Sequence, residues 1–98
     1  MAQRKIKWSL TALQNKLAIL DYWFHINKSP TFPDKLNNQF NKALVLASIF
    51  PFAGIPTEKE NIRFVIVRDY KLYYEIYPDE IKVLTVWDSR RNPENLKI

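Results

Sequence analysis

The sequence predicts a small α+β domain, because its helical and strand signals come in separate blocks instead of alternating. Apolar residues recur every three or four positions between residues 10 and 50, and every second position from residue 61 onward. A short alternating segment precedes both blocks. The expected order is therefore β-α-α-β-β-β, with a helix hairpin packed on one face of a mostly antiparallel sheet.

Residues Lys5–Trp8 alternate basic and apolar side chains, which is typical of a half-buried strand. Ser9 then offers an N-cap, and the helix that follows is expected to end near Asn27. The apolar stripe that we expect to face the core consists of Leu10, Leu13, Leu17, Leu20 and Phe24, widened by Ile19, Trp23 and Ile26.

A second helix is expected after Pro30 and Pro33, and it should run to about Ile49 because Pro51 disfavours its continuation. Its apolar positions repeat the helical spacing: Leu36, Phe40, Ala43, Ala47 and Phe50. Only a few residues separate the two helices, so an antiparallel hairpin is expected.

Three strands are expected from residue 61 onward, over residues 62–67, 71–77 and 81–87, joined by short turns. In the first of them, Ile62, Phe64 and Ile66 alternate with Arg63, Val65 and Val67. Since the helices should cover one face of the sheet, the other face is expected to be partly open. We expect Arg63 on that open face.

Ninety-eight residues suffice for one domain spanning residues 1–98. Fifteen lysines and arginines against ten acidic residues give a formal charge of +5, which favours acidic or polyanionic partners. The chain has no cysteine, one histidine and one glycine. This composition argues against disulfides, a thiol nucleophile, a zinc site and a glycine-rich phosphate loop, so we expect no cofactor and no metal.

No uninterrupted apolar run approaches the ~18 residues of a membrane-spanning helix. The basic N-terminus lacks the long apolar stretch of a signal peptide. We therefore expect a soluble, cytoplasmic protein with no membrane partner.

From Lys5 to Leu96 the sequence resembles the RelE/ParE family, which are toxins of bacterial type II toxin–antitoxin systems, including plasmid stabilisation proteins. The resemblance rests on an ordered set of short elements. These are Trp8-Ser9 after the first strand, the loop from Pro51 to Gly54, Ile62-Arg63, Tyr70-Lys71, and the segment from Val86 to Pro93 that contains Arg90, Arg91 and Asn92.

The resemblance implies the fold above and a cognate antitoxin as partner. It also implies one of two targets, since some members cleave mRNA on the ribosome and others inhibit DNA gyrase. Our first hypothesis is a toxin that blocks translation as a metal-independent mRNA endoribonuclease. The alternatives are a non-catalytic gyrase inhibitor and a degenerate, non-toxic member that only binds its antitoxin.

Metal-free RNA cleavage needs a base, an acid and cations that stabilise the charge developing on the phosphate. The resemblance implies Arg63, Arg90 and Arg91 for these catalytic roles, since Arg63 matches the family's arginine on the second strand and Arg90 and Arg91 match its basic segment after the last strand. The alternative for Arg63 is a surface pair with Glu75, and for the other two arginines a solvated turn balanced by Asp88 and Glu94. The chain departs from the family nucleases because no tyrosine or histidine follows Arg91.

Lys71, Tyr70 and Tyr73 are the candidate RNA-binding residues, by phosphate contact and by stacking on bases. The alternative for the tyrosines is packing, with the hydroxyl at the rim. Trp23 and Phe24, near the end of the first helix, are the candidate antitoxin-binding residues, because exposed aromatic pairs suit protein grooves.

Overall fold

The computed structural model describes residues 3–96 and residue 98. It confirms the predicted order of elements and adds one short strand, β2, inside the segment expected to be a loop. The elements are β1 (Lys5–Trp8), α1 (Leu10–Asn27), α2 (Thr31–Ile49), the 3-10 helix η1 (Pro51–Ala53), β2 (Ile55–Pro56), β3 (Ile62–Val67), β4 (Tyr70–Ile76), β5 (Glu80–Asp88) and the 3-10 helix η2 (Pro93–Asn95).

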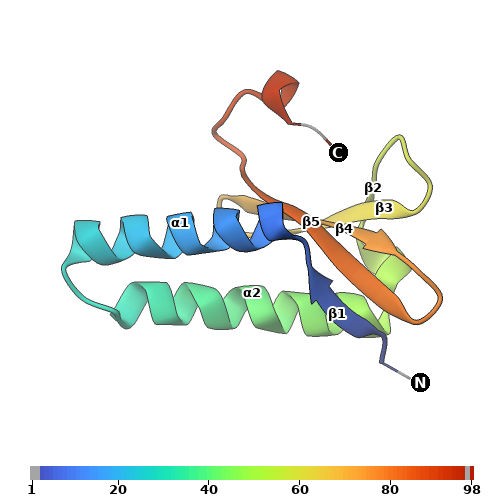
Figure 1. Cartoon of the computed structure of the whole chain (residues 1–98), viewed down its shortest axis with the longest axis horizontal. Coiled ribbons are helices and arrows are strands. Elements are labelled where there is room, and N and C mark those ends of the chain that lie inside the picture. The colour runs from blue at the N-terminus through green and yellow to red at the C-terminus, as the bar shows by residue number, and fades with distance from the viewer. Residues whose placement is uncertain (1–2, 97) are drawn as a thin grey trace.

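The five strands form one sheet in the order β1-β5-β4-β3-β2. β1 runs parallel to β5, and the other neighbours are antiparallel. The two helices lie side by side as an antiparallel hairpin, and the C-terminal segment rises from the end of β5 away from them (Figure 1). No helix within residues 3–96 is long and apolar enough to cross a bilayer.

Ser9 begins α1 as predicted, because its Oγ accepts a hydrogen bond of 3.0 Å from the backbone N–H of Ala12. The same hydroxyl donates to the carbonyl of Leu84 at 3.0 Å, so the cap also ties α1 to β5. Lys28 ends the helix in the left-handed conformation, with φ 54°.

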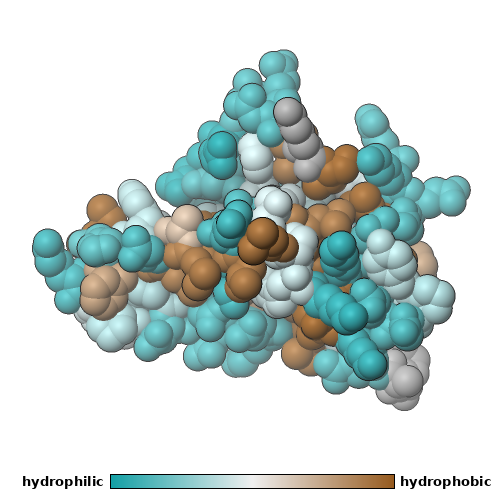
Figure 2. Space-filling view, viewed as in Figure 1, coloured by the Kyte–Doolittle hydropathy of each residue, from teal (hydrophilic) through white to brown (hydrophobic). Residues whose placement is uncertain are grey.

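The side of α1 that faces the core matches the predicted stripe only at Leu20 and at the widening residues Ile19 and Trp23. Ala12 is fully buried, and Ile19, Leu20 and Trp23 pack against the core, whereas Leu10 is 70% exposed and Leu17 is 56% exposed. Residues 12, 19 and 23 also follow helical spacing, and the small side chain of Ala12 allows a close approach to the sheet. Leu10, Leu13 and Leu17 therefore face outward, and Figure 2 shows apolar surface over α1.

α2 supplies the predicted residues Leu36 and Phe40 to the core, together with Leu44, and all three are buried. They pack against Leu72, Val83 and Val86 of the sheet. Phe50 is an exception, since it caps the helix and stays half exposed.

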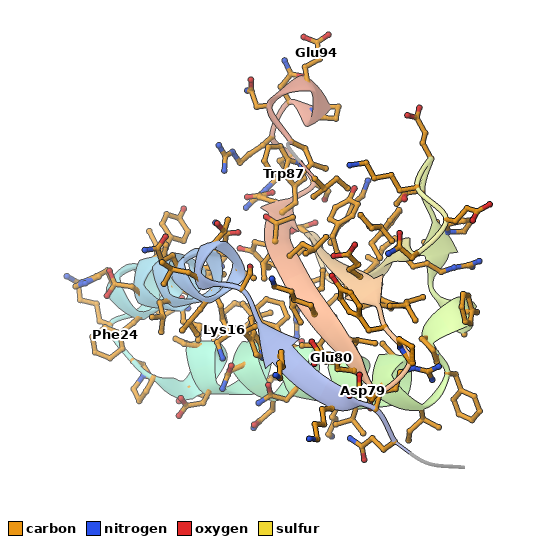
Figure 3. The ribbon with its side chains drawn as sticks, turned by 45° about the vertical axis from the view of Figure 1, so that its right-hand side comes forward. Lys16, Phe24, Asp79, Glu80, Trp87 and Glu94 are labelled. Carbon is orange, nitrogen blue, oxygen red and sulfur yellow. The ribbon has the colours of Figure 1, made fainter. Side chains whose placement is uncertain are left out.

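The sheet face away from the helices carries a second apolar cluster. Buried Ile62, Tyr73 and Trp87 form its centre, with Phe64, Leu84 and Leu96 packed around them. Figure 3 places Trp87 below the C-terminal segment, near its junction with β5. Because this part of the face is apolar and Leu96 packs on it, the expectation of polar content here is wrong.

Candidate functional site

Arg63 lies on the helix side of the sheet, not on the far face. It shares its strand face with Val65 and Val67, which pack into the cores beneath the helices. Its Nη1 donates to the carbonyl oxygens of Phe52 and Gly54, each at 2.9 Å. The expectation of an open-face Arg63 is therefore wrong.

The alternative partner considered for Arg63, the carboxylate of Glu75, is engaged elsewhere. Glu75 accepts from Asn61 Nδ2 at 3.0 Å and from Tyr77 Oη at 2.7 Å. Glu75 lies opposite Ile62 in the register, while Arg63 lies opposite Tyr74. Side chains of neighbouring positions point to opposite faces of the sheet, so the two cannot pair.

Arg63 is one half of a clamp on the loop of residues 51–54. The other half is Tyr74, fully buried, whose Oη donates to the carbonyl of Pro51 at 2.6 Å. Burial raises the pKa of Tyr74, and the charge of Arg63 partly opposes that effect. Gly54 is buried against both side chains, and a Cβ added there would overlap the Tyr74 hydroxyl. Gly54, the single glycine of the chain, therefore lies where the side chains of Tyr74 and Arg63 leave no room for a methyl group.

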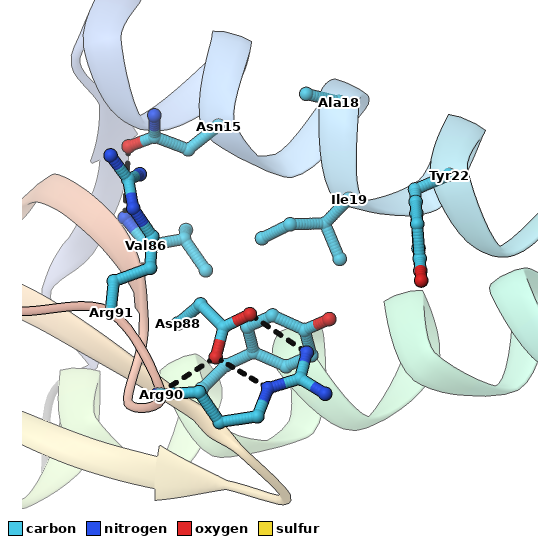
Figure 4. Close-up of a pocket in the computed structure, with 9 residues that line it drawn as sticks. Asn15, Ala18, Ile19, Tyr22, Val86, Asp88, Arg90 and Arg91 are labelled. Carbon is cyan, nitrogen blue, oxygen red and sulfur yellow. Dashed lines mark hydrogen bonds and ion pairs between the residues drawn. The ribbon is translucent and has the colours of Figure 1, made fainter.

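Arg90 is held by a carboxylate two residues away. Its Nε lies 2.9 Å from Asp88 Oδ1 and its Nη2 lies 2.8 Å from Asp88 Oδ2, in a bidentate pair (Figure 4). The side-chain hydrogen bonds from Arg90 lower the pKa of the Asp88 carboxyl. Arg90 is thus balanced by Asp88, as the structural alternative predicted, through its Nε and Nη2.

Arg91 is the least committed of the three arginines. Its guanidinium lies 4.7 Å from the ring centroid of Trp87 and forms no hydrogen bond or ion pair with the residues that the structure describes. It borders a cavity of about 450 Å³ between α1 and the end of β5 (Figure 4). The cavity is lined by Asn15, Ile19, Tyr22, Tyr70, Asp88, Arg90 and Arg91, among others.

The tyrosines occupy packing positions. Tyr70 is 4% exposed on the helix side, where its Oη accepts from Trp23 Nε1 at 2.8 Å. Tyr73 is buried in the far-face cluster against Phe64, with ring centroids 4.9 Å apart, and burial raises its pKa. The packing alternative fits both residues.

The structure therefore divides the predicted RNA site into three places. Tyr70, Arg90 and Arg91 border one cavity, and Arg63 is held at the η1 loop. Lys71 lies on the far face with its Nζ 5.1 Å from the Phe64 ring centroid. These residues do not converge on one catalytic centre.

The two predicted antitoxin-binding residues differ in accessibility. Trp23 is half buried, with its ring edge-to-face against Tyr22 and Phe32, each at 5.1 Å. Phe24 is exposed near the C-terminal end of α1, as Figure 3 shows. Of the two, Phe24 is the more accessible, since it is 45% exposed.

One polar residue of structural importance was missed by the sequence analysis. Asn15 Oδ1 accepts from Thr85 Oγ1 at 2.8 Å and from the backbone N–H of Val86 at 3.2 Å. Both bonds sit beside a register shift between β4 and β5. In the sequence, Asn15 lies at helical spacing between Ala12 and Ile19, so it could have been recognised once those two positions are known to face the core.

The β1 strand, helix hairpin and antiparallel meander form the α+β architecture that the RelE/ParE resemblance implied. The family model described as the ParE toxin of the type II toxin-antitoxin system, parDE, matches residues 6–93. The chain therefore belongs to the ParE toxin family, and the predicted RelE/ParE resemblance is confirmed. Membership implies a cognate antitoxin as partner.

The fold is similar to that of a solved chain from the chromosomal ParDE toxin–antitoxin system of P. aeruginosa. The TM-score is 0.71 at 17% sequence identity, and the match covers 86% of this chain and 94% of that chain. At this identity the likeness concerns the fold, and it confirms the predicted α+β architecture. The comparison with curated proteins gave no match.

Proposed function

We propose that this ParE-family toxin acts by binding DNA gyrase and inhibiting it, without catalysing RNA cleavage. The observation that carries the proposal is the commitment of Arg63 and Arg90 to partners within the chain. Arg63 holds two loop carbonyls, and Arg90 holds both oxygens of Asp88. A nuclease site needs such cations free to meet the developing charge of the phosphate.

The exposed leucines of α1 support a protein target. Leu10, Leu13 and Leu17 lie on one side of the helix and remain exposed, while Ala12 is buried. Contiguous apolar surface of this kind marks protein-binding sites more often than RNA-binding sites. We infer that this leucine stripe contacts the target, in the cytoplasm where gyrase works.

Ribosome-dependent mRNA cleavage is the second candidate, and Arg91 is the observation that favours it. Its guanidinium has no polar partner among the described residues and borders a cavity wide enough for a phosphate. Arg91→Ala therefore separates the two mechanisms, since an exposed turn residue can be changed without disturbing the core.

Two assays with the purified chain test the proposal. In a supercoiling assay with purified gyrase, the wild type and Arg91→Ala should inhibit equally, and Leu17→Glu should inhibit at least tenfold less. In a translation extract with a defined mRNA, the message should stay intact at the same toxin concentrations. Cleavage that disappears in Arg91→Ala, together with uninhibited gyrase, would replace this proposal with the nuclease one.

A further inference from the structure

The cavity between α1 and the end of β5 is bordered by hydrogen-bond donors that lack acceptors. Arg91 borders it and forms no hydrogen bond or ion pair with the residues that the structure describes. Asn15 borders it as well (Figure 4). Asn15 Oδ1 already accepts from Thr85 Oγ1 and from the backbone N–H of Val86, so the amide orientation is fixed. Its Nδ2 donates to no residue within the described part of the chain.

Arg91 is held in a way that keeps its N–H groups available. Its guanidinium lies over the ring of Trp87, 4.7 Å from the ring centroid. A cation–π contact stabilises the position of the charge but provides no oxygen acceptor. A guanidinium in this state suits a carboxylate or a phosphate, which it can bind through two parallel hydrogen bonds.

The carboxylate beside Arg91 is already satisfied. Among the described residues that border the cavity, Asp88 is the only carboxylate, and its two oxygens accept from Arg90 at 2.9 and 2.8 Å. Two guanidinium groups and one carboxylate leave these lining residues with a net charge of +1. The cavity therefore attracts an anion, and Arg91 is the cation that remains to bind it.

The rest of the cavity is mostly apolar. Ala18, Ile19 and Val86 line it together with the rings of Tyr22 and Tyr70. Tyr22 is 54% exposed, so a bound molecule can reach its ring from solvent. The volume of about 450 Å³ lies within the range of small-molecule sites, which combine apolar walls with a few placed polar groups.

The distribution of cations favours a single anionic group over a polymer. A nucleic-acid strand needs several cations that follow its phosphates. Arg63 is held at the η1 loop and Lys71 lies on the far face of the sheet, so neither adds to this cavity. One available guanidinium matches one carboxylate or phosphate head.

We propose that this cavity binds a small organic anion, with a carboxylate or phosphate head on Arg91 and Asn15 and an apolar or aromatic body against Ile19 and Tyr22. Leu10, Leu13 and Leu17 do not border the cavity, so this inference does not depend on the identity of the toxin's target. A bound anion joins α1 to the segment after β5, and it should stabilise the folded chain in proportion to its occupancy.

The test is an NMR titration of the ¹⁵N-labelled full chain with phenyl phosphate and with benzoate. The two probes carry the same ring on the two candidate heads, and the tighter one identifies the head. Either should shift the side-chain amide signal of Asn15 until it saturates. Inorganic phosphate lacks the ring and should bind at least about tenfold more weakly than phenyl phosphate, because no apolar surface is buried.

Two substitutions should change the affinity for the tighter probe in opposite directions. Arg91→Gln should weaken binding at least about tenfold, because the hydrogen bonds from a charged donor are lost. Asp88→Asn should strengthen binding about threefold or more, because it removes a like charge and weakens the hold on Arg90. Opposite signs also exclude general unfolding as the cause.

Lys82→Gln is the matched control for the charge of Arg91. It removes one positive charge at an exposed position of β5 that does not border the cavity. At physiological salt the affinity should stay within about twofold of the wild type, because distant surface charges are screened.

Three results would overturn the inference. Shifts that do not saturate, or equal losses in Arg91→Gln and Lys82→Gln, would reduce the binding to general attraction by a basic surface. Equal affinities for phenyl phosphate and inorganic phosphate would leave the apolar wall without a role. A single-stranded oligonucleotide that binds through Arg91 more tightly than either probe would assign the cavity to nucleic acid.

Discussion

Replacing the only glycine with alanine tests the clamp on the η1 loop. Gly54 has φ −66° and ψ 163°, which any residue can adopt, so backbone strain makes no contribution. The added Cβ would overlap Tyr74 Oη and lie 3.1 Å from Tyr74 Cζ and 3.2 Å from Arg63 Cβ. Tyr74 is fully buried, and therefore its ring has no solvent to turn into.

The expected loss follows from two effects. Moving Tyr74 breaks its 2.6 Å hydrogen bond and leaves the carbonyl of Pro51 buried without that donor, which costs about 1–3 kcal/mol. Overpacking a rigid site costs about 1–3 kcal/mol more. We therefore expect Gly54→Ala to lower the free energy of unfolding by about 3 kcal/mol, or Tm by about 12–24 °C in a domain of this size.

A double-mutant cycle shows whether the hydroxyl is the obstacle. In a Tyr74→Phe background the overlapping oxygen is absent, and Gly54→Ala should then cost only about 1 kcal/mol, from the close ring carbon. The measurement is urea unfolding of the four purified variants, followed by circular dichroism. A loss below about 0.5 kcal/mol for Gly54→Ala, or equal losses in both backgrounds, would refute the reasoning.

Three further predictions concern the helix–sheet contact and the titrating groups. Asn15→Ala should lower the free energy of unfolding by about 1–3 kcal/mol, because it leaves the Thr85 hydroxyl and the Val86 N–H without their acceptor. Gln14→Ala, at an exposed neighbouring position, is the control. Equal unfolding curves for the two variants would contradict the prediction. Arg90 lowers the pKa of Asp88, so this pair stabilises the folded state above about pH 4 and the contribution is lost as the pH falls through the folded-state pKa. Asp88→Asn should therefore flatten the acid side of a stability–pH curve measured between pH 2 and 5, and an unchanged slope would count against the pair. Burial raises the pKa of Tyr74, so the unfolded chain loses the phenolic proton first and the free energy of unfolding falls as the pH rises above about 10. Tyr74→Phe should reduce that fall, as measured by unfolding at pH 9–11. An identical fall in both proteins would argue against a buried phenol.

The sequence determined the type and order of the main elements, because each carries its own periodicity and end signals. Ser9 caps α1 as expected. The alternation over Lys5–Trp8 predicted β1 with the bounds that the structure shows. Such signals are local, since they depend on side chains within one or two turns or one strand. The ordered set of motifs was also sufficient to predict the family.

Which side of each element faces the core was decided only in the tertiary structure. In helix α1 the exposed side carries Leu10, Leu13 and Leu17, whereas Ala12 faces the sheet, where its small side chain allows close packing. In β3, Ile62 and Phe64 suggest the core face, whereas Val65 and Val67 occupy it and Ile62 joins a separate cluster under Leu96. A periodicity of two or 3.6 locates a face but does not say what will cover it.

The candidate site shows the same division. From sequence alone, Arg63 was expected on the open face of the sheet, and the family resemblance made it a catalytic candidate. Its partners are backbone carbonyls of residues 52 and 54, which leave no trace in the side-chain pattern and come close only when the η1 loop folds back on β3. Thus the sequence by itself determined the elements and the family through local periodicity. The tertiary structure decided which charges are satisfied internally, because their partners are distant in the chain or belong to the backbone.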